Sequence, residues 1–186
     1  MHIGVIAEDR SDIEVLYALT CKLVEPSAFS FKPFIGQGCG KIRRKCAAWA
    51  KNLLERGCSH LIVIHDLDTK VEKTLRRDIT QCIRGLRFRG YIVLIPVREI
   101  ESWLLADPEA IRKTFNLEKI PNIPKHPETI LRPKEYLRDI VWKYGRKQYV
   151  NTIHNRRIAD YVLIDRLPAC ASFSAYPPFV ITVFHN

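Results

Sequence analysis

Apolar runs that are typical of buried strands recur four times in the first hundred residues, and a helical pattern follows each of the first three. The runs are "HIGVIA" (2–7), "FSFKPFIG" (29–36), "SHLIVI" (59–64) and "GYIVLIPV" (90–97). The third and fourth are continuous rather than alternating, as in strands that a parallel sheet buries on both faces. Pro33 lacks a backbone N–H, so it favours a sheet edge for the second run. The alternation predicts an α/β sandwich with a mainly parallel four-stranded sheet.

Helical spacing and a change in composition predict the rest of the organisation. Ser11 or Asp12 is the expected N-cap of the first helix, and Gly57 is expected to close a second helix over 40–56. A helix over 99–115 is expected to break near Asp107 and Pro108. After it the chain becomes rich in proline. We therefore expect a catalytic domain over 1–115, and over 116–186 a Pro-rich connection with a small helical extension packed on that domain.

Carboxylates follow three of the four predicted strands. They are Glu8 and Asp12 after the first, Asp66 and Asp68 after the third, and Glu99 and Glu101 after the fourth. A single acid at a strand end is usually a helix cap or a solvated loop residue. The carboxyl ends of parallel strands share one edge, however, so these acids are expected to converge there.

Acidic side chains at this density suggest a hard cation. Carboxylate oxygens are the ligands of Mg²⁺ or Mn²⁺, and a bound cation would turn the repulsion between Asp66 and Asp68 into attraction. The alternative is structural, with Asp68 capping the following helix and Asp66 paired with a neighbouring Arg or Lys.

The order of these acids resembles the TOPRIM domain of topoisomerases, primases and nucleases. Glu8 in "GVIAEDRSD" matches the glutamate after the first strand, and Asp66 and Asp68 in "IVIHDLDT" match the Asp-x-Asp motif. Asp12 and Thr69 make the chain most similar to the nuclease branch that includes the overcoming-lysogenisation-defect proteins. The resemblance covers residues 1 to about 115. It departs from the motif at Asp9, where a glycine is usual.

The stretch "REIESWLLAD" (98–107) is further similar to a group of little-characterised bacterial TOPRIM-like proteins, in which Glu101 would join the acidic site. The resemblance implies a nuclease with Glu8, Asp66, Asp68 and Glu101 as catalytic residues. It implies Glu8, Asp12, Asp66 and Asp68 as the metal ligands. A lysine commonly assists such cleavage, and Lys70, Lys73 and Lys134 remain alternatives for that role. A role in bacterial defence against phage or mobile elements is also implied.

Positive charge favours a polyanionic partner. The chain carries 30 Lys and Arg against 20 Asp and Glu, a formal charge of +10, which favours nucleic acid over a membrane surface. Two clusters are expected to contact DNA or RNA: Lys41, Arg43, Arg44 and Lys45, and Lys143, Arg146 and Lys147 within "WKYGRKQY" (142–149). The alternatives are a solvated helix face for the first cluster and, for the second, a Trp142 that merely anchors its helix.

Two other motifs do not match, the first in its spacing and the second in its residues. Thr69 follows Asp68 directly, whereas the haloacid-dehalogenase motif separates them by one residue. The loop "GQGCGK" (36–41) has Ile35 and Ile42 where a nucleotide-binding P-loop needs Gly and Ser or Thr. Without a leader, a membrane span or a zinc pattern, the chain is expected to be cytoplasmic, with free thiols.

The sequence therefore predicts a divalent-metal-dependent nuclease acting on DNA or RNA. Two alternatives stay open: a non-catalytic module that binds nucleic acid or a protein partner, and a nucleotidyltransferase.

Overall fold

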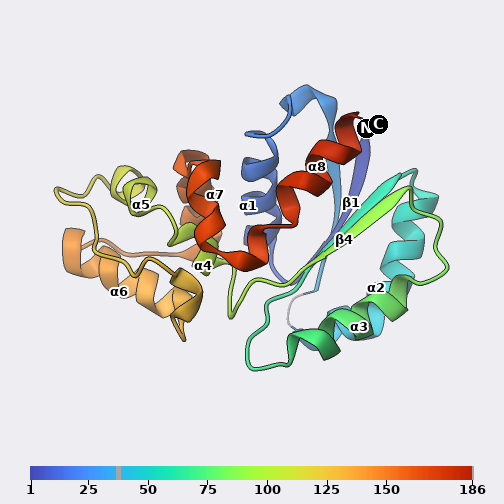
Figure 1. Cartoon of the computed structure of the whole chain (residues 1–186), viewed down its shortest axis with the longest axis horizontal. Coiled ribbons are helices and arrows are strands. Elements are labelled where there is room, and N and C mark those ends of the chain that lie inside the picture. Colours follow the sequence, from blue (N-terminus) through green and yellow to red (C-terminus); the bar gives the residue numbers. More distant parts are fainter. Residues whose placement is uncertain (37–38, 186) are drawn as a thin grey trace.

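The computed structural model describes residues 1–36 and 39–185, without the side chains of 39–41, 43 and 185. Its centre is a four-stranded sheet in the order β2-β1-β3-β4, with every pair of neighbours parallel (Figure 1). The strands are β1 (His2–Ala7), β2 (Ser30–Ile35), β3 (His60–Ile64) and β4 (Gly90–Leu94). The predicted parallel sheet is confirmed, and the Pro33 strand lies at an edge as expected.

Helices cover both faces of the sheet, which makes three layers. On one face lie α1 (Arg10–Thr20) and α8 (Tyr176–His185), and on the other α2 (Cys39–Glu55) and α3 (Glu72–Ile83) (Figure 1). Successive residues of β1 divide between these faces, with Val5 packed in the α1 cluster and Ile6 in the α2 cluster. Gly4 allows the close approach of α2, because a Cβ atom there would lie 2.9 Å from Leu53 Cδ1.

The chain after β4 forms a helical layer beside the sheet. It contains α4 (Glu101–Leu104), α5 (Pro108–Phe115), α6 (Pro133–Gly145) and α7 (Asn151–Tyr161), with short 3₁₀ turns at Pro127–Thr129, Ile164–Ala169 and Ala171–Phe173. A further 3₁₀ turn, Pro26–Ala28, lies between α1 and β2. The predicted break falls between α4 and α5, where Asp107 caps α5 by accepting from Glu109 N and Ala110 N. At the predicted boundary, Asn116 ends α5 in the left-handed conformation.

Residues from both sides of that boundary share one hydrophobic core. α7 packs against α1 and α5, and its buried Ile158 belongs to the same cluster as Val5. The Tyr176 hydroxyl reaches back to Thr20 Oγ1 at 2.6 Å. The helical extension therefore helps to form the interior beneath the sheet edge. Over the part of the chain described, no helix has the length and apolar character needed to cross a membrane.

Candidate functional site

Four carboxylates meet at the carboxyl edge of the sheet. Glu8 follows β1, Asp12 lies in the first turn of α1, Asp66 follows β3, and Glu101 opens α4. Burial raises the pKa of Asp66 well above its usual range, and the charges of Asp12, Glu101 and Glu8 raise it further. Acids from three strand ends thus act on one another directly. We call these four residues the carboxylate cluster.

The two loops that carry Asp66 and Glu101 are aligned by backbone pairing that continues past the strands. Leu67 N donates to Pro96 O at 3.0 Å, and Asp68 N donates to Arg98 O at 3.1 Å. The Arg98 guanidinium in turn donates to Asp68 O at 2.7 Å. The parallel ladder of β3 and β4 therefore extends into the site and holds these loops side by side.

A capping box on α1 sets the position of Asp12. Asp9 is the N-cap, and its Oδ1 accepts from Ser11 N at 2.8 Å, while Asp12 Oδ2 accepts from Asp9 N at 2.9 Å. The prediction of Ser11 or Asp12 as N-cap was therefore wrong by two or three residues. Asp9 has φ −129°, an extended conformation open to any residue, so the backbone here needs no glycine.

Burial also raises the pKa of Asp12, to about 7. The charges of Glu101, Asp9 and Glu8 add to the effect, and the hydrogen bond from Asp9 N opposes it. The folded protein thus keeps a proton on Asp12 that the unfolded chain releases near its ordinary pKa of 3.8. Between these two values the folded state binds more protons, so the free energy of unfolding falls as pH rises, and it levels off above about 7.

Asp12→Asn should remove the loss of stability that the Asp12 charge causes above pH 7, because asparagine does not ionise. Its side-chain oxygen can still accept from the Asp9 N–H. In EDTA at pH 8, we expect the variant to melt several degrees above wild type, and the difference should shrink at pH 5. Differential scanning fluorimetry at the two pH values measures it. A variant that melts below wild type at pH 8 would contradict the assignment.

His65 lies beside Glu8 and Asp66, and each of the three residues has a buried polar side-chain atom without a hydrogen-bond partner. The His65 side chain is fully buried, and its Nδ1 lies 2.7 Å from Asp66 O and 2.6 Å from Glu8 Oε1, of which only the first contact has hydrogen-bond geometry. Glu8 Oε1, Asp66 Oδ1 and His65 Nε2 are buried without a hydrogen-bond partner. Each such atom costs about 1–3 kcal/mol. A ligand that satisfied the two oxygens would stabilise the fold.

Glu101 is held by two residues from the helical extension. The Tyr149 hydroxyl lies 3.0 Å from Glu101 Oε1, and Asn155 Nδ2 donates to the same oxygen at 3.1 Å. The hydroxyl also contacts Asn155 Oδ1. Burial first, and then the charge of Glu101, raise the pKa of Tyr149, so it stays protonated. These contacts leave Glu101 Oε2 available to a ligand.

Sequence reasoning missed this role for both residues. Tyr149 ends the segment 142–149, whose cations were expected to contact DNA or RNA, but its side chain is buried. Asn155 was not singled out, although it lies on the buried face of α7 with Ile158 and Ala159. A polar residue at a core position of an amphipathic helix is the signal that would have indicated it.

The structure does not bring Asp68 into the carboxylate cluster. Its backbone is left-handed (φ 50°), and its carboxylate is 45% exposed and paired with Lys70 Nζ at 3.0 Å. Asp68 is also absent from the charges that act on Asp66. The alternative, in which Asp68 caps the following helix and Asp66 pairs with an Arg or Lys, is also wrong. The N-cap of α3 is Val71, and Asp66 Oδ1 has no hydrogen-bond partner.

Glu99 joins the edge of the site to α6. Its Oε2 accepts from Lys134 N at 2.9 Å, and burial raises its pKa. Of the three lysines proposed to assist catalysis, Lys70 is paired with Asp68, Lys134 lies at the start of α6, and Lys73 is exposed on α3.

The chemistry of the cluster suits a hard cation. Within the described residues, no group of three or more His, Cys, Asp or Glu side chains has a geometry that could hold a metal ion. The oxygens that could serve are Glu8 Oε1 and Asp66 Oδ1, which lack partners, with Asp12 Oδ1 and Glu101 Oε2 beside them. Buried, mutually repelling carboxylate oxygens are what Mg²⁺ or Mn²⁺ would neutralise.

The basic residues fall into two places. α2 begins just after β2, so its first turn lies at the carboxyl edge; Arg44 and Lys45 are exposed there, and the side chains of Lys41 and Arg43 lie outside the described part. At the end of α6, Lys143 lies over the Tyr144 ring and Arg146 over the Trp142 ring. Lys147 Nζ donates to Phe115 O at 2.6 Å.

Comparison with known proteins gives a family without a function. A family model described as "Domain of unknown function (DUF4276)" matches residues 20–176. No curated protein matches the chain, and no solved structure does. The match spans most of the chain, including both Asp66 and the residues that hold Glu101. The chain therefore belongs to the DUF4276 family.

Proposed function

We propose that this protein is a nuclease that depends on Mg²⁺ or Mn²⁺ and hydrolyses phosphodiester bonds of DNA or RNA. The observation that carries the proposal is the carboxylate cluster, in which burial and the charges of neighbouring acids raise the pKa of Asp66 and Asp12, and in which Glu8 Oε1 and Asp66 Oδ1 are buried without hydrogen-bond partners. A structural role would instead place a Lys or Arg side chain beside these oxygens, and the described residues show none there. A cluster of this kind is costly to the fold and points to a functional site.

The residues that would hold the metal are Glu8, Asp12, Asp66 and Glu101. When bound, Mg²⁺ or Mn²⁺ supplies positive charge for the phosphate oxygens and lowers the pKa of water. The resemblance to the TOPRIM nucleases supports this proposal, because Glu8 and Asp66 of that motif both lie in the cluster. Asp68, the third residue of the motif, would have to leave Lys70 to join them.

Hydrogen bonds hold two of these carboxylates in place, those of Asp12 and Glu101. The Asp9 N–H fixes one oxygen of Asp12, and Tyr149 with Asn155 fixes one oxygen of Glu101. His65 Nδ1 lies 2.7 Å from Asp66 O and 2.6 Å from Glu8 Oε1. The Asp12 and Glu101 carboxylates are therefore oriented before a substrate arrives, as catalysis by fixed charges requires.

The test is incubation of the purified protein with supercoiled plasmid and with RNA, in Mn²⁺, in Mg²⁺ and in EDTA. We expect cleavage with either metal and none in EDTA. Salt-sensitive binding without cleavage would favour the non-catalytic module, and incorporation of labelled nucleotide would favour the transferase. If no binding is detected at low salt, the protein-partner alternative becomes the better explanation.

A further inference from the structure

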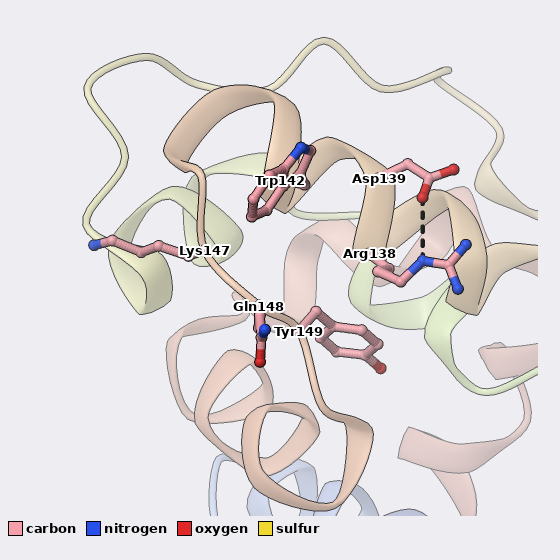
Figure 2. Close-up of a pocket in the computed structure, with 6 residues that line it drawn as sticks. All are labelled: Arg138, Asp139, Trp142, Lys147, Gln148 and Tyr149. Carbon is pink, nitrogen blue, oxygen red and sulfur yellow. Dashed lines mark hydrogen bonds and ion pairs between the residues drawn. The ribbon is translucent and has the colours of Figure 1, made fainter.

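A groove runs along α6 and the segment that joins it to α7. Its larger part is a pocket of about 550 Å³, shown in Figure 2 and lined by Arg138, Asp139, Trp142, Lys147, Gln148 and Tyr149. A second pocket of about 330 Å³ shares Arg138 and Tyr149 and extends to Lys134 and Asn151. We call the two pockets the α6 groove. Their sizes fall in the range of sites that hold small organic groups.

The α6 groove adjoins the carboxylate cluster. Tyr149 lines both pockets, and its hydroxyl contacts Glu101 Oε1. Lys134 lines the second pocket, and its backbone N donates to Glu99. Two residues that line the groove, Tyr149 and Lys134, thus contact acids at the carboxyl edge of the sheet directly. A chain-like ligand lying in the groove would lead toward the site.

Trp142 gives the groove an aromatic surface. Its side chain is 51% exposed, whereas Leu137, Ile140 and Val141 of α6 are buried. Figure 2 shows the Trp142 ring on α6 on the same opening as Gln148 and Tyr149 of the following segment. The Arg146 guanidinium lies 5.7 Å from the ring centroid. A half-exposed Trp beside a cation is suited to stacking on a planar group near a phosphate.

The charge around the groove matches a polyanion. Residues 132–148 contain six Lys and Arg against two acids, Glu135 and Asp139. Asp139 is an ion-pair partner of Arg138 at 3.2 Å, which reduces its repulsion toward a phosphate. An aromatic surface flanked by cations is the combination found in binding sites for single-stranded nucleic acid, because base faces and backbone phosphates are then contacted together.

We propose that the α6 groove binds an unpaired base of a single-stranded nucleic acid, stacked on Trp142, and that single strands are therefore the substrate class of the site. The binding step stands on the groove alone, and the cleavage step rests on the proposed function. In a duplex each base is paired and stacked on its neighbours, so it offers no free face to Trp142. The groove thus selects single strands.

The test compares Trp142→Leu with Trp142→Phe, which keeps an aromatic face. The probes are a short labelled DNA strand and the fully paired duplex of the same sequence, bound in EDTA at low salt. For Trp142→Leu we expect the Kd of the single strand to rise roughly tenfold, with Trp142→Phe within about twofold of wild type and duplex binding unchanged. Tyr91→Leu, a similarly exposed aromatic on β4 (47%), is the matched control and should behave like wild type.

Unchanged single-strand affinity in Trp142→Leu, or an equal loss for strand and duplex, would overturn the groove assignment. Cleavage in Mn²⁺ separates this result from the proposed function. If wild type binds single strands through Trp142 but cleaves nothing, the groove assignment holds and the nuclease proposal is wrong. If wild type cleaves and Trp142→Leu has the same affinity and rate, the nuclease proposal holds and the groove assignment is wrong.

Discussion

Asp66→Asn should lower the rate of metal-dependent cleavage by roughly a thousandfold, the scale of several kcal/mol of lost charge stabilisation. The substitution keeps the shape of the side chain but removes the charge that repels Asp12, Glu101 and Glu8. Glu8→Ala should have a similar effect on the rate. Affinity for nucleic acid should stay near wild type or increase, because each change removes a negative charge that faces the phosphates.

The same variants should lose the stabilisation by metal. A cation that binds only the folded protein raises the melting temperature, so millimolar Mn²⁺ should raise it in wild type and much less in Asp66→Asn. Asp165→Asn, at an exposed acid in a 3₁₀ turn, is the matched control and should keep both cleavage and the shift. Cleavage by wild type in EDTA, or full activity in both site variants, would show that the cluster is not the catalytic centre.

Tyr149→Phe and Asn155→Leu should each lower activity about 10–100-fold, the usual effect of removing groups that orient metal ligands. Each removes a contact to Glu101 Oε1; Tyr149→Phe keeps the aromatic ring, and Asn155→Leu keeps a side chain that branches at the same atom. The Mn²⁺ concentration needed for half-maximal activity should rise, because Glu101 would no longer be fixed. Steady-state rates across a Mn²⁺ titration measure both effects.

Two controls separate positioning from a general loss of stability. Tyr176→Phe removes another buried hydroxyl, which lies 2.6 Å from Thr20 Oγ1 and makes no contact with the carboxylate cluster. This variant should melt at a lower temperature than wild type and need the same Mn²⁺ concentration. In a Glu101→Gln background, Tyr149→Phe should lower the activity little further, because two substitutions that act through one shared residue do not have additive effects. Full additivity would mean that Tyr149 acts independently of Glu101.

The apolar runs determined the sheet and much of the site. Four strand-like segments joined by helices can pack with short connections only in a largely parallel arrangement, and parallel strands place their carboxyl ends at one edge. That argument brought together six acids that lie far apart along the chain, and the structure places four of them, Glu8, Asp12, Asp66 and Glu101, in one cluster. Burial on both faces of the sheet is a property of the segment itself, so it can be read locally.

Tertiary structure alone decided which way the side chains turn and what holds them. Asp68 lies two residues from Asp66, yet its left-handed backbone turns its carboxylate to Lys70, and no periodic pattern predicts a single backbone conformation of this kind. The contacts from Tyr149 and Asn155 to Glu101 span 48 and 54 residues. They exist because α7 packs against α1 and α5, and hydrogen bonds between buried groups depend on such packing, which is not encoded in any one stretch of sequence.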